Sequence, residues 1–358
     1  MSQAAHIVEP RWNVDRTPCW GARLHEPGGS TRRLHFHLPE GSTEPLAADG
    51  LVAAFLPHVM RIGGALHVAG ALTRTALTNL VVFSESWANW RPDRYHRVSL
   101  SADQVVDTVP GSSPEAIVAW SGSLLSTHTL VRHLDHRVPG AFTLRAVVRV
   151  SGLGNAEPDA VIAHAALAQD NLPLRLVHVE GADGLVDPFI GKLPVVAAAL
   201  HACAGSAGQA LHARLWPVTA QLYYPRPGPF LPDVFSGGHL AVRADGGSAT
   251  PARMAREIAR HPALVAILPN DRGTSLAFQA AGLALPPACR RLRGPELLVH
   301  GFGGPIAAAE AAGAALDWQG RWPLALRAGC ASVRFAIQAR SIARWLGAAA
   351  GLRPAWPR

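Results

Sequence analysis

After residue 115, short apolar runs alternate with segments of helical periodicity. The apolar runs cover residues 116–120, 143–150 and 174–179, and helical patterns occupy residues 127–134 and 159–169 between them. Strands about thirty residues apart, with one helix in each gap, are typical of repeated βαβ units. The sequence therefore predicts an α/β fold in which helices cover both faces of a parallel sheet.

A loop of small residues, Ser-Gly-Ser-Leu-Leu-Ser-Thr, follows the first apolar run and precedes a helix. In a parallel sheet such a loop lies beyond the carboxyl end of its strand, where ligands bind. Backbone N–H groups and hydroxyls at the start of a helix favour an anion, because the helix dipole is positive there. We therefore predict nucleotide or phosphate binding by Ser121, Gly122, Ser123, Ser126 and Thr127.

The same residues allow a structural interpretation. A serine-rich turn can simply cap the helix that follows it, with Ser126 or a neighbour as the N-cap residue. Lys192, the only lysine of the chain, is the one amine that can stabilise charge on a phosphate. It is a candidate catalytic residue, although a lysine at a helix start is more often a surface residue.

The first 108 residues are predicted to form a smaller α+β region. A hairpin is expected over residues 23–38, and its second arm places His35 and His37 on one face. Two histidines in this arrangement can bind a metal, but no third ligand is evident, so a solvent-facing strand is favoured. Helices are expected over residues 51–62 and 73–90.

A Pro- and Gly-rich stretch near residue 110 suggests a boundary. We predict three regions: residues 1–108, a parallel α/β domain over residues 109–300, and a mainly helical region over residues 301–358. Trp87, Trp90 and Tyr95 are expected to pack the first region on the second rather than to stack a base.

Composition narrows the classes of partner. The formal net charge is +8, but the arginines are scattered along the chain, so no nucleic-acid partner is expected. The four cysteines form no CxxC pair, which argues against a zinc knuckle. The chain starts without an apolar segment typical of a signal peptide, and no apolar run is long enough for a membrane span. A cytoplasmic protein without a membrane partner is the expectation.

The strand and its Ser-Gly-Ser-Leu-Leu-Ser-Thr loop resemble the PP-loop of the N-type ATP pyrophosphatases, whose pattern is SGGxDS. This superfamily of adenine nucleotide alpha hydrolase-like (HUP) proteins includes asparagine synthetase and the queuosine-precursor enzymes. The segments around residues 51–95, 192–203 and 239–261 are similar to bacterial relatives of unassigned function. The resemblance implies a HUP-type fold, ATP as ligand, Mg²⁺ as its metal, and adenylation of a carbonyl or carboxylate with release of pyrophosphate.

Two positions of the loop depart from this pattern. Leu125 stands where the family has the aspartate that manages the magnesium-bound pyrophosphate, and Ser123 replaces the second glycine. An apolar side chain cannot coordinate Mg²⁺, which requires oxygen ligands. An acidic residue from elsewhere would have to replace the missing carboxylate, and the candidates are Asp183, Asp187 and Asp245.

Two functions therefore remain open. The sequence favours a pseudoenzyme that keeps a degenerate phosphate loop to bind a nucleotide weakly or to hold a partner protein or a second copy of itself. The alternative is an ATP-dependent adenylating enzyme, for amide- or thioamide-type activation in a specialised biosynthetic pathway, with a remodelled metal site. The residues do not identify a substrate, a partner or an oligomeric state.

Overall fold

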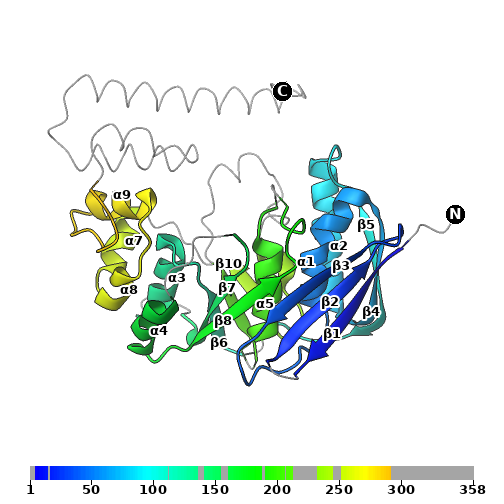
Figure 1. Ribbon diagram of the computed structural model, residues 1–358, viewed down its shortest axis with the longest axis horizontal. Helices are drawn as coiled ribbons and strands as arrows, with labels where there is room; N and C mark the ends of the chain where they lie inside the picture. The colour runs from blue at the N-terminus through cyan, green and yellow to red at the C-terminus, as the bar shows by residue number, and fades with distance from the viewer. Residues whose placement is uncertain are drawn as a thin grey trace. The chain divides into compact units, whose positions relative to one another are not determined.

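A single sheet of ten strands organises the larger part of the molecule (Figure 1). This computed structural model describes residues 5–14, 17–111, 113–135, 141–154, 160–187, 190–205, 207–212, 232–244 and 251–291. The strands are β1 (Ala5–Asn13), β2 (Cys19–His25), β3 (Thr31–His37), β4 (Gly64–Thr73), β5 (Val98–Val106), β6 (Glu115–Ala119), β7 (Thr143–Ser151), β8 (Leu174–Glu180), β9 (Gln209–His212) and β10 (Ala241–Ala244). Their order across the sheet is β10-β9-β6-β7-β8-β3-β2-β1-β4-β5.

The half of the sheet that follows residue 114 is parallel. Strands β8, β7, β6, β9 and β10 lie side by side in that order, and each pair of neighbours is parallel. Helices α3 (Leu124–Leu134), α4 (Ala160–Ala168) and α5 (Leu193–Cys203) occupy the connections. The connections from β6 to β7 and β8 step in one direction and the connection from β8 to β9 steps back, so the topological switch point lies between β6 and β9.

Strand β6 is buried on both faces, as a parallel strand between helices should be. Ile117 and Ala119 belong to the main core, together with residues of α5. Ala116 and Val118 point to the other face and form a separate cluster with Leu211 of β9, on the side where α3 contacts β6, β7 and β9. Helices therefore cover both faces of the parallel half, which confirms the predicted α/β architecture in this coarse form.

The N-terminal half of the sheet is mixed. Strand β2 is antiparallel to both of its neighbours, β1 and β3, whereas β1, β4 and β5 are parallel. Strand β3 pairs antiparallel with β8 and joins the two halves. The predicted boundary at residue 108 falls in the connection between β5 and β6, and the strands on its two sides belong to one sheet.

Helices α1 (Asp49–Ile62) and α2 (Arg74–Trp90) pack on the same face as α5 and enclose the main core. Twelve consecutive residues of α1, from Asp49 to Met60, are buried, because the helix lies between the sheet, α2 and α5. Trp87 and Tyr95 are also buried, with ring centroids 5.4 Å apart. Tyr95 also donates to Asp187 of the second region, so the predicted packing role is confirmed for Tyr95. Trp87 packs on Phe83 and Tyr95 of the first region, and the side chain of Trp90 lies outside the described residues.

A buried carboxylate ties the starts of α1 and α2 to the loop before β10. Asp49 accepts hydrogen bonds from the backbone N–H of Thr73 at 2.8 Å and from its hydroxyl at 2.6 Å. The Thr73 hydroxyl oxygen in turn accepts from the N–H of Gly238 at 3.2 Å and caps α2 through Ala76. A Cβ at Gly237 would overlap the Asp49 carboxylate, so a glycine is required there.

The second compact unit contains the described residues of Gly247–Arg358 and is helical. It consists of α7 (Pro251–Ile258), α8 (Pro262–Ala266) and α9 (Arg272–Ala280), and α7 contacts both of the others. Asp271 caps α9 by accepting from the N–H of Thr274 at 2.7 Å. The helical region predicted over residues 301–358 lies outside the described residues.

Most of the elements expected from the sequence are present, and four strands are additional. The hairpin, the helices of the first region and the alternating strands and helices of the second are confirmed, with ends that shift by a few residues. Strands β1, β5, β9 and β10 were not predicted, because each is amphipathic or short and owes its conformation to its neighbours in the sheet.

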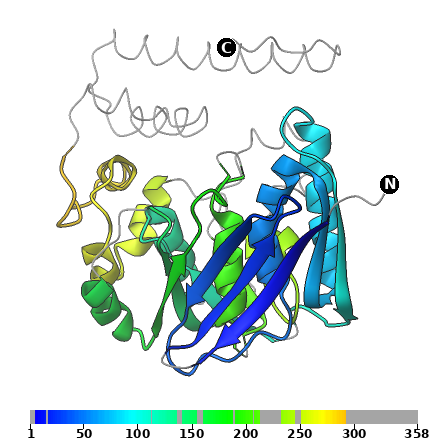
Figure 2. The ribbon, with the colours of Figure 1, turned by 45° about the vertical axis from the view of Figure 1, so that its right-hand side comes forward.

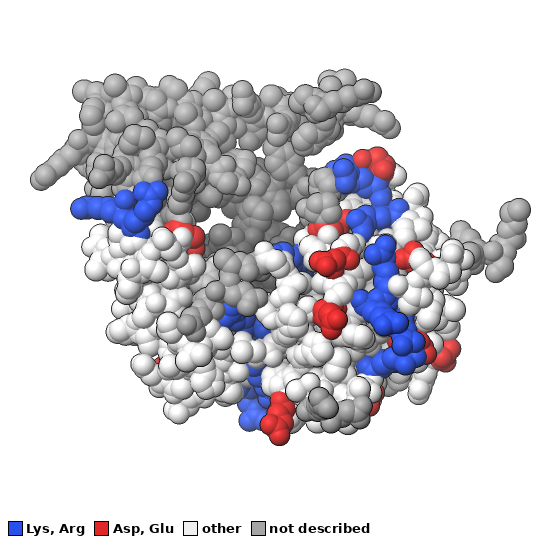
Figure 3. All heavy atoms as spheres, viewed as in Figure 1, with Lys and Arg blue, Asp and Glu red and all other residues white. Residues whose placement is uncertain are grey.

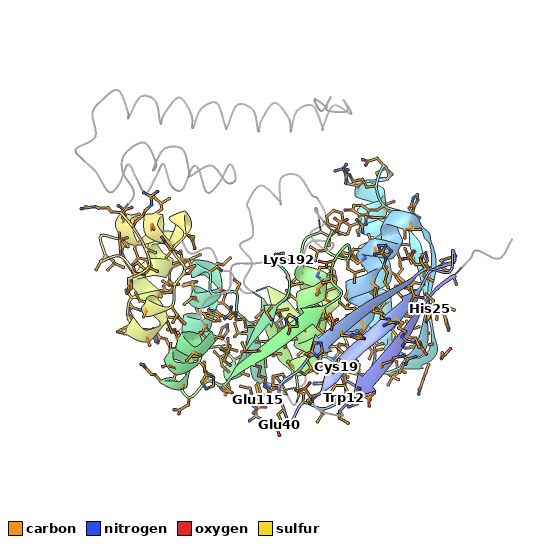
Figure 4. The ribbon with its side chains drawn as sticks, in the orientation of Figure 1. Trp12, Cys19, His25, Glu40, Glu115 and Lys192 are labelled. Atoms are coloured by element: carbon orange, nitrogen blue, oxygen red, sulfur yellow. The ribbon has the colours of Figure 1, made fainter. Side chains whose placement is uncertain are left out.

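The Asp49 cluster predicts a site of large mutational effect. Asp49→Ala would leave the N–H and hydroxyl of Thr73 without an acceptor in a buried position, and the expected loss of unfolding free energy is about 1–3 kcal/mol. Chemical denaturation measures this loss. Glu40→Ala, which removes an exposed carboxylate (Figure 4), is the matched control and should stay within about 0.5 kcal/mol of the wild type. Equal effects of the two variants would contradict the structural role of Asp49.

Candidate functional site

The small-residue loop lies at the carboxyl end of β6, next to the topological switch point of the parallel half. Open α/β sheets bind their ligands at this position. Gly122 has φ +82°, a left-handed conformation that glycine adopts without steric cost. The turn therefore reverses tightly between strand and helix and places Ser121 and Ser123 on either side of Gly122.

Three serine hydroxyls of the loop form a compact triangle. The Oγ atoms of Ser121 and Ser123 are 3.0 Å apart, those of Ser121 and Ser126 are 3.2 Å apart, and those of Ser123 and Ser126 are 3.1 Å apart. Ser121 is exposed, Ser123 is half-buried and Ser126 is buried. Hydroxyls rotate freely about the Cβ–Oγ bond, so each can redirect its hydrogen toward an anion at the exposed edge of this triangle.

The start of α3 supplies backbone donors beside these hydroxyls. Ser123 is the N-cap residue, and its Oγ accepts from the N–H of Ser126 at 3.3 Å. The sequence analysis left Ser126 or a neighbour as the cap, and the neighbour Ser123 has this role. The first N–H groups of a helix have no partner within it, and those of Leu124 and Leu125 donate to no other described residue. Hydroxyls and free amides together suit a phosphate group.

Thr127 has a different environment from the serines. Its side chain is fully buried, and its hydroxyl oxygen accepts from the indole N–H of Trp120 at 3.1 Å. This hydrogen bond fixes the end of β6 against the first turn of α3. Thr127 therefore positions the loop, and its predicted contact with a ligand would require this bond to break.

Asp183, Asp187 and Asp245 are the acidic residues considered as substitutes for the missing loop aspartate, and the structure describes the first two. Asp187 is buried and accepts from the Tyr95 hydroxyl at 2.7 Å and from the N–H of Ile190 at 3.0 Å. Asp183 is exposed, and Asp245 lies outside the described residues. Among the residues that the structure describes, no carboxylate makes a hydrogen bond with the loop, and no group of three or more His, Cys, Asp or Glu side chains is arranged to hold a metal ion.

Lys192 directly precedes α5, the helix that follows β8 (Figure 4). Chain connectivity places it at the same edge of the parallel half as the loop, since both follow carboxyl ends of parallel strands. It is the N-cap residue of α5, but its side chain does not cap the helix. Within the described part of the chain no hydrogen bond joins Lys192 to the serines, so its catalytic role stays a prediction.

A second polar cluster lies between the β2–β3 turn and the end of α1. Glu26 accepts from Arg32 at 2.7 Å and from Ser30 at 2.8 Å, and it lies 3.0 Å from the Nε2 atom of His58. Arg61 donates to the carbonyl oxygen of Gly184 at 2.7 Å. The sequence analysis missed this cluster, because its members come from a turn, a strand, a helix and a distant loop.

Ionisation in this cluster follows from its contacts. Burial opposes the ionised form of Glu26, but the hydrogen bonds from Ser30, Arg32 and His58 outweigh burial and lower the pKa of Glu26 from 4.5 to about 2. Burial also lowers the pKa of His58, against the opposing hydrogen bond to Glu26. Glu26 is thus a carboxylate at neutral pH, which balances the charge of Arg32, and the cluster stabilises the fold without a ligand.

The predicted histidine pair is confirmed as a half-exposed strand face. His35 and His37 lie on one face of β3, and His37 Nε2 is 3.2 Å from a Glu180 carboxylate oxygen. The cysteines Cys19, Cys203 and Cys289 are free thiols; Cys330 lies outside the described residues. Within the described parts of the chain, no helix is both long and apolar enough to cross a membrane.

Comparison of the chain with protein-family models, with curated proteins and with solved structures found no significant match. The resemblance to the PP-loop superfamily therefore rests on the loop and on the sequence segments described above.

The Glu26 cluster predicts a pH-dependent loss of stability. A carboxylate whose pKa is lowered by folding stabilises the protein fully above its ordinary pKa of 4.5, and this contribution disappears as the pH falls through about 2. Glu26→Gln should therefore destabilise the protein at pH 6. The difference in unfolding free energy between this variant and the wild type should become smaller as the pH approaches 2. Denaturation at a series of pH values measures this difference. Glu40→Gln serves as the exposed control, and a constant difference for Glu26→Gln would contradict the charge-based role.

Proposed function

We propose that this protein binds the phosphate of a nucleotide at the β6–α3 loop without hydrolysing it. The observation that carries the proposal is the combination of three clustered hydroxyls with two helix amides that have no described acceptor. These donors lie at the carboxyl end of β6, beside the switch point where α/β proteins bind ligands. Each donor is neutral, so binding is expected to be weak.

An adenine nucleotide is the ligand that the proposal favours. Numbered along the chain from β6, the parallel strands β8-β7-β6-β9-β10 have the order 3-2-1-4-5, and this order begins the doubly wound arrangement of nucleotide-binding folds. The order supports the PP-loop and HUP resemblance of the Ser-Gly-Ser-Leu-Leu-Ser-Thr loop. Fold alone does not define a ligand, so the nucleotide assignment rests on the loop and the resemblance together.

The composition of the loop supports a non-catalytic role. Leu125 occupies the position of the family's metal-binding aspartate, and the loop itself contains no carboxylate. Magnesium-dependent release of pyrophosphate depends on anionic oxygen ligands to hold the metal against the phosphates. A protein that binds a nucleotide in this way would use it to stabilise a conformation that a partner protein or a second copy recognises.

Calorimetric titration with ATP, in the presence and absence of Mg²⁺, tests the proposal. The wild type is expected to bind ATP, with little dependence on Mg²⁺, and to release no pyrophosphate. Ser121→Ala removes the exposed hydroxyl of the triangle without removing the α3 cap, and should weaken binding by about tenfold. Binding weakens because the variant lacks one hydrogen-bond donor, the Ser121 hydroxyl, to a negatively charged phosphate oxygen.

Ser99→Ala is the matched control, because Ser99 is an exposed serine of β5 far from the loop in the strand order. It should bind ATP as the wild type does. The absence of any binding heat at millimolar ATP would refute the proposal. Release of pyrophosphate that disappears in Ser121→Ala would instead establish the adenylating enzyme.

A further inference from the structure

One face of the N-terminal half of the sheet carries polar side chains and no described helix. Helices α1, α2 and α5 pack on the opposite face, and Figure 2 shows β1–β3 in front of them. Alternate residues of each strand point to the uncovered side. On β2 and β3 these residues are Cys19, Gly21, Arg23, His25, Thr31, Arg33, His35 and His37.

Two arginines face each other on this surface. Arg23 of β2 and Arg33 of β3 are directly paired in the antiparallel register. Like charges in this arrangement destabilise a sheet, and no carboxylate of the described residues lies within ion-pair distance of either guanidinium. Arginine side chains gather over β1–β3 in Figure 3, with acidic side chains beside them. Two arginines without an ion-pair partner among the described residues therefore lie side by side on this surface.

Three carboxylates of this surface, those of Glu9, Asp103 and Glu180, contact other side chains; Asp103 of β5 lies 3.0 Å from the Nε2 atom of His67 on β4. Glu9 of β1 pairs with Arg11 at 3.0 Å and lies 3.4 Å from His25. Glu180 of β8 is 3.2 Å from His37. Glu9 lies directly opposite Arg23 in the β1–β2 register, but its ion pair is with Arg11, so Arg23 and Arg33 have no ion-pair partner among the described residues.

Imidazole rings lie next to the arginine pair. The ring of His35 lies over Gly21 of β2, where a Cβ would overlap the ring, so the missing side chain allows the ring to rest against the backbone. Burial, with smaller contributions from His37, Arg33 and Arg23, lowers the pKa of His35 against the opposing charge of Glu180. At neutral pH the ring is uncharged and half-exposed, which suits stacking.

A further pair of rings extends this row onto β8. His37 and His178 are directly paired across β3 and β8, and their ring centroids are 6.0 Å apart at an interplanar angle of 32°. Positive charge and flat rings on a single sheet face are the two features that sequence-tolerant binding of single strands uses, with arginines for the phosphates and rings for the bases.

We propose that the open face of β2, β3 and β8 binds single-stranded nucleic acid, with Arg23 and Arg33 at the backbone phosphates and His35, His37 and His178 beneath the bases. An acidic peptide would match the arginines but would leave the rings without a function, so the observations favour nucleic acid. Arg23 and Arg33 meet through the register of the β2–β3 hairpin, and the sequence analysis, which predicted the hairpin but expected no nucleic-acid partner, did not identify this face.

Fluorescence anisotropy of the full chain with labelled oligo(dT) and oligo(U) of about 16 nucleotides tests this proposal. The wild type is expected to bind both probes and to lose affinity between about 50 mM and about 200 mM NaCl, because binding releases counterions. The double variant Arg23→Ala/Arg33→Ala should flatten the slope of log K against log salt concentration by about 1.4, or about 0.7 for each phosphate contact.

His35→Ala should act differently from the arginine variants. Loss of one stacking ring is expected to weaken binding on the order of tenfold and to leave the salt slope unchanged. The control is the double variant Arg74→Ala/Arg97→Ala, which removes the same charge from exposed arginines at the start of α2 and directly before β5 and should bind as the wild type does.

The variant Arg33→Glu separates binding from folding. It places opposite charges across β2 and β3, so its melting temperature should equal or exceed that of the wild type, while probe binding is lost. Three outcomes would overturn the proposal: no binding at about 50 mM NaCl, equal effects of the two double variants, or binding of polyglutamate as tight as that of the oligonucleotides with no effect of His35→Ala. The last outcome would assign the face to an acidic protein.

Discussion

Three residue pairs between β3 and β8 join the two halves of the sheet. Phe36 and Val179 form the central pair and are both buried, so the junction belongs to the main hydrophobic core. Gly152 and Gly181 lie beside it with φ near +80°, and a Cβ at either position would overlap the backbone of a neighbouring strand. Close backbone approach at this junction, which only glycine permits, allows a mixed and a parallel sheet to continue into each other.

The junction determines which surfaces are available for ligands. Because the sheet is continuous, α1, α2 and α5 form one layer on one face and bury a single core there. On the other face, α3 and α4 contact strands of the parallel half, and the described part of the chain provides no helix over β1–β3. The β6–α3 loop and the open face of β1–β3 are therefore separate candidate sites, one at a sheet edge and one on a sheet face. Different chemistry distinguishes them: hydroxyls and amides at the first, guanidinium groups and imidazoles at the second.

The acidic side chains and the arginine pair of the open face differ in their role in the fold. Buried acids are used by the fold: Asp49 holds Thr73, and Asp187 holds Tyr95. Glu26 likewise balances Arg32. Acids that are used in this way stabilise elements from distant parts of the sequence, whereas Arg23 and Arg33 face each other without such a partner. The repulsion between Arg23 and Arg33 destabilises the sheet, and the fold does not require it. A ligand that contacts both side chains would explain their presence.

Local periodicity in the sequence determined the helices, most of the strands and the loop at the start of α3, because these depend on residues only a few positions apart. The tertiary structure decided the remainder. Strands β1 and β5 require partners from other segments, and the Glu26 cluster and the row from Arg23 to His178 exist only after β3 has paired with β2 and β8. Strand register is a long-range property: a shift by one residue would turn Arg33 and His35 toward the core. For this reason the sequence alone identified the serine loop as a candidate site but not the open face.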